Sequence, residues 1–538
     1  MNLVKPESIT TTGAITRSTI GTYFDSTGIM QTAAIDAVRV NYDPYTKEFL
    51  GVLIENAATN LVFQSQDFDN ASWSKTRTTV TANATTAPDS TATAEKLIED
   101  TSVTTSHFIS QNQTLTANLF YTMSVYAKAS ERSRIVLRVG NSANWTTGTP
   151  SVGFNLSTGT LFSVSGDSTS SGTIQPIGNG WYRCSITAQF GTTTASGGLV
   201  INLDNSTSIN YTGDGTSGVY IWGAQIETGS LASSYIKTTT AAVTRAADVI
   251  TGSGLVYTNV TNAYAEWSSG TTYALGTSVS YGIYGTYVSL QNSNLNQNPL
   301  TATTYWVRSG PTNKMAAFDD QISSVSSSAT DIIFAVTASS IDTVALLNVN
   351  GSRTAIAVAD ASLKTPIYHN TQQLTGGDSV DWYGYFFYDA DTVRTTSIYL
   401  DIPTASNVLI SVKVSGVGTT SIGTFVTGVL KNLGNTQYGV SAGIIDYSRK
   451  DTDEFGNVTF IKRNYSKRIN ASVTLTNANL NKVQRILYQL RATPVLWLAS
   501  TDIQFEEPLI TYGFYRDFST EISYPTHSIC NLQIEGLI

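Results

Sequence analysis

Short runs of alternating apolar and polar residues, separated by turns rich in glycine, serine and aspartate, fill the stretch from about residue 73 to 248. Successive side chains of a strand point to opposite faces, so each run has one face for a core and one for solvent. Many such strands joined by polar turns predict a two-sheet sandwich. The residues expected to face its core include Tyr121, Met123, Val125 and Ala127 in one strand and Ile135, Leu137 and Val139 in the next.

The whole chain is expected to be mainly β. Charged residues make up only 13% of the 538 residues, whereas tyrosine alone occurs 28 times. This mixture suits pleated strands, and it lacks the excess of helix-forming residues found in helical proteins. One helix is predicted in NANLNKVQRILYQLRATP, with Asn477 or Asn479 as its cap and Pro494 beyond its end. Its apolar residues recur at helical spacing: Val483, Ile486, Leu487 and Leu490.

Charge and sequence composition argue against several classes of partner. The net charge is −8 and basic residues do not cluster, so no nucleic-acid partner is expected. No apolar run is long enough for a membrane span, and no secretory signal is expected. The three histidines have no metal-ligand spacing, and neither a metal nor a cofactor is predicted. Cys184 and Cys530 are expected to be buried thiols of a chain made in a reducing cytoplasm.

Four segments are predicted from composition and turn signals. An extended N-terminal arm covers 1–72, in which Asp43 and Pro44 set up a turn before the short strand FLGVLIE. A jelly-roll sandwich covers 73–250, a small aromatic module 260–310, and a β-rich domain with one helix 311–538.

The small module is unusual because it holds many rings and hardly any leucine. From Trp267 to Trp306 the chain carries five tyrosines as well. A fold this small can build only a minimal core, and rings supply the most buried area per residue. Tyr273, Val279 and Tyr287 are therefore expected to form that core.

Several motifs resemble a recurrent module of bacteriophage and prophage tail-associated proteins, described as a concanavalin-like, carbohydrate-binding-type jelly roll. These motifs are TYFDSTG, YDPYTKEFLGVLIE, NLVFQSQDFDNASWSK, GWYRCSIT and VYIWGAQIETGSLASSYIKTTTAAVTRAAD. The resemblance covers most of residues 20–250 and implies a virion protein with a sandwich fold. VRSGPTNKMAAFDDQISSVSS and the closing segment resemble parts of the same phage tail proteins.

The ring spacing from Trp267 to Tyr287, followed by Pro299 and Trp306, is similar to small chitin- and cellulose-binding modules of bacterial hydrolases. Members that bind chitin tend to carry Trp just before the proline, where this chain has Gln297 and Asn298. The resemblance implies a three-stranded fold.

Sugars present C–H faces that stack on flat rings, and Asn and Gln can bond their hydroxyls. Rings also supply contact area at low entropic cost. Trp267, Tyr284 and Trp306, beside QNSNLNQN, are therefore predicted to form a carbohydrate-binding platform. The same rings could instead hold a spacer together or contact a neighbouring tail protein, because Tyr and Trp are enriched at protein interfaces.

No catalytic residue is predicted. A polysaccharide depolymerase would need two carboxylates flanking a sugar bond. The acidic pairs, such as Asp319 with Asp320, Asp389 with Asp391, and Asp451, Asp453 and Glu454, lie in turn-like contexts in which Asp bonds its own backbone.

The predicted function is that of a bacteriophage tail or baseplate protein, located in the virion, which contributes to recognition of host-surface polysaccharide. Its other partners would be tail or baseplate proteins. A homo-oligomer with cyclic symmetry is expected, built around YGFYRDF and ICNLQIEGL or around the N-terminal arm. The alternatives are a purely architectural collar or baseplate component and, third, a depolymerase.

Overall fold

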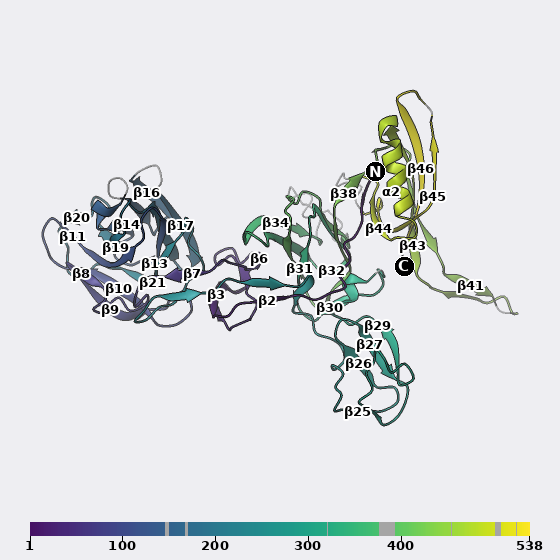
Figure 1. Cartoon of the computed structure of the whole chain (residues 1–538), viewed down its shortest axis with the longest axis horizontal. Coiled ribbons are helices and arrows are strands. Elements are labelled where there is room, and N and C mark those ends of the chain that lie inside the picture. The colour runs from purple at the N-terminus through teal and green to yellow at the C-terminus, as the bar shows by residue number, and fades with distance from the viewer. Residues whose placement is uncertain are drawn as a thin grey trace. The chain divides into compact units, whose positions relative to one another are not determined.

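The computed structural model describes residues 1–145, 150–166, 170–319, 321–375, 393–452, 454–500, 507–522 and 524–537. Over this range the chain is mainly β, as predicted (Figure 1). It divides into two compact units: unit A comprises residues 15–249, and unit B comprises residues 1–14 and 250–538. The boundaries fall within β2 (Ala14–Thr16) and β23 (Val249–Thr251). None of the described helices is long and apolar enough to cross a membrane.

Unit A is built on two six-stranded antiparallel sheets, which confirms the predicted sandwich. In spatial order the first sheet contains β17 (Ser171–Gly178), β18 (Trp181–Gln189), β13 (Phe120–Ala129), β21 (Gly218–Thr228), β10 (Ala94–Glu99) and β9 (Thr78–Thr85). The second contains β16 (Thr160–Ser165), β15 (Ser151–Asn155), β14 (Arg134–Gly140), β19 (Ala195–Asp204), β12 (Phe108–Leu115) and β8 (Ser74–Thr76). The seven residues expected to face the core, from Tyr121 to Val139, are all buried in one cluster that both sheets line.

The first sheet is also covered on its outer face, which the alternation of residues does not predict. Tyr126 in β13 is buried there and packs edge-on against Trp222 and Tyr235. Met30, far away in the sequence, belongs to the same apolar cluster. The polar face that alternation assigns to β13 is therefore a second buried layer.

Residues 15–72 contribute Met30 and the partly buried Phe24 to this second layer and belong to unit A. The structure thus places nearly all of the predicted arm over 1–72 in the same unit as the sandwich. Asp43 makes the expected turn, since its carboxylate accepts the N–H groups of Tyr45 and Thr46. The strands of this region are β3 (Gly21–Phe24), β4 (Met30–Ala33), β5 (Val40–Tyr42), β6 (Phe49–Val52) and β7 (Ala58–Asn60), and the later short strands are β11 (Thr105–Ser106), β20 (Asn210–Tyr211) and β22 (Val243–Arg245).

A buried ionic cluster ties the beginning of unit A to its end. One carboxylate oxygen of Asp248 lies 3.0 Å from Arg17 Nη1, and the other lies 2.7 Å from Arg39 Nη2. Glu55 lies 2.6 Å from Arg39 and 3.0 Å from Arg245. All three arginines are fully buried, so each depends on these carboxylates for its charge balance.

Unit B contains a smaller sandwich with its own apolar core. One sheet is formed by β24 (Gly254–Thr258), β31 (Ile332–Ala338), β36 (Val408–Ser415), β33 (Arg353–Asp360) and β34 (Thr365–Gln373). The other is formed by β30 (Ser326–Ser328), β37 (Thr420–Gly428), β32 (Thr343–Asn350) and β35 (Ser397–Tyr399).

An eight-stranded sheet and one helix complete the C-terminal part of unit B. Along the sheet lie β38 (Leu430–Asn432), β1 (Asn2–Val4), β44 (Val495–Leu498), β45 (Ile510–Glu521), β46 (His527–Gly536), β43 (Tyr465–Thr476) and β39 (Asn435–Thr436), and β40 (Ser441–Asp446) also pairs with β43. Asn2 to Val4 thus pair with residues more than four hundred positions later, on both sides of β1.

The predicted helix is confirmed as α2 (Leu480–Gln489), and Val483, Leu487 and Leu490 are buried against the sheet. The predicted side-chain cap is not observed. Asn479 stands at the cap position without a capping bond, and the amide of Asn477 donates instead to the carbonyl oxygens of Tyr524 and Pro525.

Replacing Asp248 should strongly destabilise unit A. The Asp248→Ala variant leaves Arg17 and Arg39 buried without their shared carboxylate, and breaking a buried ion pair in this way costs about 3–5 kcal/mol. Urea unfolding followed by tryptophan fluorescence would measure the loss. Asp36→Ala, which removes an exposed carboxylate near Arg17, should cost much less. Equal stability of Asp248→Ala and wild type would contradict the importance of the cluster.

Unit A should also lose stability as the pH rises through the titration of Glu95. Burial, together with the charge of Asp69, raises the pKa of Glu95 to about 7, so the folded protein keeps a proton that the unfolded chain has lost. Below about pH 4.5 both states are protonated, and the penalty grows from there to about pH 7. The free energy of unfolding of Glu95→Gln should equal that of wild type at pH 4.5. At pH 8 it should be higher than that of wild type by about 2–3 kcal/mol. Exposed Glu48→Gln is the control, and a pH-independent difference would refute the prediction.

Candidate functional site

The small aromatic module of unit B contains the predicted site residues. Its three-stranded antiparallel sheet has the order β26 (Ser278–Tyr281), β27 (Gly285–Ser289) and β29 (Trp306–Gly310). A second pair is formed by β25 (Thr272–Tyr273) and β28 (Asn294–Leu295).

The module's core is made of rings, as expected for a fold with few aliphatic residues. Tyr273, Val279 and Tyr287 are all buried, which confirms the three core positions predicted from the sequence. Trp306 joins them and packs edge-on against Tyr273 with ring centroids 5.3 Å apart.

Trp306 is therefore not part of an exposed platform, which corrects the placement suggested by the sequence. Its side chain is 2% exposed, and its indole N–H donates to the Gln297 carbonyl oxygen at 2.8 Å. The physical reason is the size of the module, because a core this small needs its largest ring inside.

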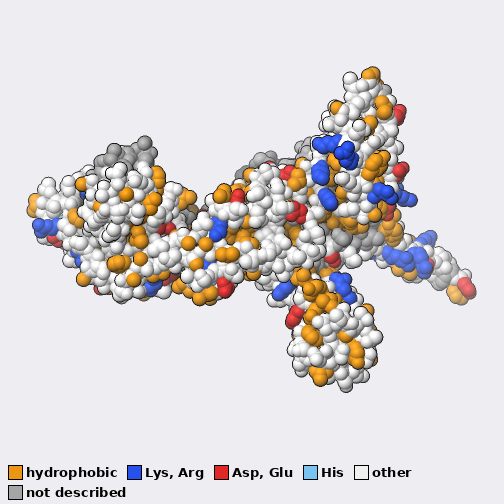
Figure 2. Space-filling model, viewed as in Figure 1, with side chains coloured by type: hydrophobic (Ala, Val, Ile, Leu, Met, Phe, Trp, Pro, Cys, Tyr) orange, Lys and Arg blue, Asp and Glu red, His pale blue; other side chains and the backbone are white. Residues whose placement is uncertain are grey.

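The other two predicted rings lie at the surface and are joined by a third. Tyr284 is 52% exposed, and its ring stacks on that of Tyr281 at 5.7 Å. Trp267 is half-buried and packs edge-on against the other side of Tyr281 at 5.6 Å. These three side chains are called the ring row below. Figure 2 shows hydrophobic side chains on the surface of this module.

Backbone pairing fixes the ring row. Trp267 N–H donates to the Ser280 carbonyl oxygen at 2.8 Å, which holds the segment before the module's first strand alongside β26. Arg308 Nε donates to the carbonyl oxygen of Tyr284 at 2.9 Å, so the turn between β26 and β27 is tied to β29. The ring row is thus carried by strands rather than by a loose loop.

Polar groups suited to hydroxyl recognition flank the rings. The Asn298 amide donates to the Tyr281 hydroxyl at 3.0 Å, and the Glu266 carboxylate accepts the N–H of Gly282. The indole N–H of Trp267 is buried and has no acceptor among the described residues. Asn298 thus positions the central ring.

Tyr281 was missed as a site residue by sequence reasoning. The signal that could have found it is the strand period: Tyr281 and Val279 share a face of β26, yet Tyr281 is the last residue of that strand. A ring at the end of a strand, followed by a turn that carries another ring, can reach the surface.

The sandwich of unit A offers no comparable tryptophan surface within the described residues. Trp145, Trp181 and Trp222 are buried, and each indole N–H has an acceptor within the unit. These three tryptophans therefore have structural roles in the sandwich.

The acidic pairs considered for catalysis give no assembled site among the described residues. Asp319 accepts hydrogen bonds from Gln321 N–H and the Ser324 hydroxyl, and Asp451 pairs with Arg449. Asp320, Asp389, Asp391 and Asp453 lie outside the described residues. No group of three potential metal-ligating side chains is present in the part of the chain that is described.

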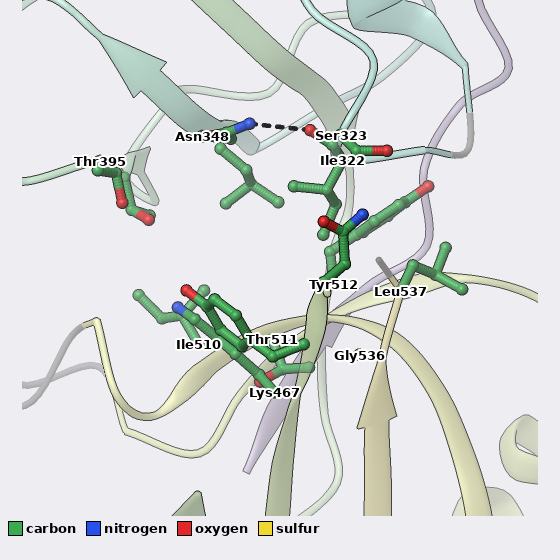
Figure 3. A pocket seen from close by; sticks show the side chains of 14 residues that line it. Ile322, Ser323, Asn348, Thr395, Lys467, Ile510, Thr511, Tyr512, Gly536 and Leu537 are labelled. Atoms are coloured by element: carbon green, nitrogen blue, oxygen red, sulfur yellow. Dashed lines mark hydrogen bonds between the residues drawn. The ribbon is translucent and has the colours of Figure 1, made fainter. Parts of the chain in front are cut away.

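A cavity of about 270 Å³ lies in unit B where the smaller sandwich meets the eight-stranded sheet (Figure 3). Burial lowers the pKa of Lys467 on its wall. The Lys467 ammonium already donates to the Glu507 carbonyl oxygen, and the Asn348 amide to that of Ile322. None of the site residues predicted from the sequence lines this cavity, so the ring row stays the candidate site.

No protein-family model and no curated protein sequence matches this chain. Among solved structures, similarity was found to the enzymatically active domain of bacteriophage CBA120 tailspike protein 4, with 14% identity over 32% of this chain and 21% of that chain, at a TM-score of 0.21. It was also found to the N-terminal CBM22 tandem domain of Paenibacillus barcinonensis Xyn10C, with 11% identity over 70% of this chain and 99% of that one, at a TM-score of 0.20. A GH78 family rhamnosidase of Bacillus sp. GL1 gives 8% identity over 83% and 36% of the two chains, at a TM-score of 0.19. This chain thus spans about a fifth of the tailspike structure, and TM-scores this low support no inference about fold or function.

Substitutions should distinguish the structural role of Trp306 from that of the exposed Tyr284. Trp306→Ala should destabilise the module by about 3–5 kcal/mol, since it empties a buried ring site, whereas Tyr284→Ala should change stability by less than about 1 kcal/mol. Hydrogen exchange of amides in β26, β27 and β29 would measure both effects. Unchanged protection in Trp306→Ala would contradict the assignment of that ring to the core.

Proposed function

We propose that this chain is a bacteriophage virion protein of the tail or baseplate that contacts host-surface polysaccharide through the ring row and performs no catalysis. The observation that carries the binding role is the ring row itself, in which Tyr284 presents half of its surface to solvent while stacked on Tyr281. The virion role is supported by the phage tail motifs of the sequence, from TYFDSTG to the VYIWGAQIE strand.

The geometry suits weak, oriented contact with a sugar. The stacked rings of Tyr281 and Tyr284 lie 28° from parallel and are held by the strand ends, so little conformational entropy is lost on binding. The carboxylate of Glu266 and the amide of Asn298 lie near the rings and are able to bond hydroxyl groups.

One such site would bind weakly, and repetition of the site would make it effective. Copies held on one particle act at high local concentration, which raises overall avidity by a factor of about 10²–10⁴ without any new contact. The proposal therefore includes assembly of this chain into a homo-oligomer. It also includes contact of that oligomer with other tail or baseplate proteins. It also includes synthesis in the host cytoplasm, where the two buried thiols of Cys184 and Cys530 would stay reduced.

Tyr284→Ala and the Trp267→Ala/Tyr284→Ala pair should weaken glycan binding at least tenfold, which is about 1.4 kcal/mol at each site. Binding would be measured on an array of bacterial polysaccharides that includes chito- and cello-oligosaccharides. Tyr45→Ala is the matched control, because it removes a 62% exposed tyrosine from a turn of unit A.

Binding by wild type that the ring-row variants retain would place the sugar elsewhere and overturn the assignment of the site. No binding by wild type, together with co-assembly of the chain with tail proteins, would instead favour the architectural role. Release of reducing ends from a bound polysaccharide would contradict the non-catalytic part of the proposal.

A further inference from the structure

A long β-hairpin extends from the eight-stranded sheet of unit B. Its base is formed by β40 and β43, which pair from Ser441 with Asn470 to Asp446 with Tyr465. Beyond the base the hairpin continues as β41 (Arg449–Thr452) and β42 (Val458–Ile461), which pair only with each other among the described strands. A two-stranded ribbon without further cover is at best marginally stable.

The hairpin carries a dense group of exposed apolar side chains. These are Tyr438 (107% exposed), Ile444 (59%), Tyr447 (40%), Val458 (44%), Phe460 (76%), Ile461 (39%) and Tyr465 (54%). Exposed apolar side chains gathered on one segment suit an interaction site. Figure 2 shows Lys and Arg side chains along the same hairpin, so its apolar residues lie among solubilising charges.

An open edge of the sheet lies at this hairpin. In the described structure β46 and β1 have a strand on both sides, whereas β45 pairs with β44 over Ile510–Gly513 and with β46 over Gly513–Glu521. An oligomer built around YGFYRDF and ICNLQIEGL or around the N-terminal arm stays a prediction. At the far end of the sheet, β38 is three residues long and contains Lys431, two features that protect an edge from pairing.

β40 has none of those protections. It is six residues long, SAGIID, contains neither Lys nor Pro, and no described strand pairs with its outer side. Five of its six residues are exposed. An unprotected edge strand presents a row of backbone donors and acceptors that suits pairing with another strand.

We propose that β40 pairs antiparallel with β40 of a second copy of this chain around a two-fold axis centred on Gly443. This register sets Ile444 of each copy opposite Ala442 of the other, and Asp446 opposite Val440. No like charges face each other along the strand. Beyond β40, strand β41 of each hairpin lies beside residues 434–437 of the other copy.

The hairpin has enough exposed residues to contribute to a two-fold interface. A two-fold interface uses the same patch on both copies, and standard interfaces involve about 20–30 residues on each side. Residues 438–465 supply a stretch of this length in which most side chains are exposed. In the proposed register Arg449 lies opposite Gln437 of the other copy and next to its Tyr438, whose fully exposed ring can receive a cation. This inference does not depend on glycan binding by the ring row.

The mass of the full chain in solution tests the proposal. Wild type is expected to run in light-scattering chromatography at twice its 57.7 kDa, or at a larger even multiple. Ile444→Lys should raise the dissociation constant of the pair at least tenfold by placing a charge opposite Ala442 of the other copy. Val417→Lys, at a fully exposed apolar position in another turn of unit B, should leave the dissociation constant unchanged. A strictly monomeric wild type at about 100 μM, or an Ile444→Lys variant of unchanged mass, would overturn the proposal.

Cross-linking tests the register of the two strands. It uses a variant that keeps the interface intact. Gly443 has open space around its Cα, so Gly443→Cys is accommodated without a clash. Cys184 and Cys530 are both buried, so the new thiol would be the accessible one. Mild oxidation or a short bis-maleimide should convert Gly443→Cys into a covalent dimer, whereas Val417→Cys should stay uncoupled. A dimer by mass that Gly443→Cys cannot cross-link would show that the copies meet through another surface, and would refute the β40 pairing.

Discussion

The carboxylate of Asp248, held between the buried guanidinium groups of Arg17 and Arg39, is the interaction on which unit A depends. These residues come from the two ends of the unit, so a single side chain joins its first and last segments. Met30 and the partly buried Phe24 of the first segment then pack against the apolar layer around Tyr126, Trp222 and Tyr235, on the outer face of a sheet whose strands lie much later in the sequence.

The sequence predicted those features of the fold that depend on residue spacing within a short segment. The inward-facing residues of β13 and β14, the turn at Asp43 and the helix α2 follow from spacings within about ten residues. The cover over Tyr126 does not, because Met30 lies about a hundred positions before it and Tyr235 about a hundred after it. The pairing of Asn2 with Asn432 and Leu498 likewise joins segments that no spacing rule relates.

Residue spacing was also insufficient to assign individual rings of the candidate site to the core or to the surface. Rings serve as both core and surface in the small module, so their number alone could not tell Trp306 from Tyr284. Three core positions were predictable from the small size of the module and the large area that rings bury, whereas the inward placement of Trp306 depends on its hydrogen bond to Gln297 and its contact with Tyr273. Tyr281 contacts both Trp267 and Tyr284 because of the conformation of the turn after β26, which residue spacing does not predict.

The pairing of β1 with β38 and β44 determines the order in which the chain can fold during synthesis. Asn2 to Val4 leave the ribosome before unit A, and their partners at 430–432 and 496–498 leave after it. At about 5–20 residues per second, those first residues wait roughly 20–100 s for a strand to pair with. Unit A, which lies between them in the sequence, has all its residues by position 249. It can close its ionic cluster during that interval, so the inserted unit folds before the one that encloses it in sequence.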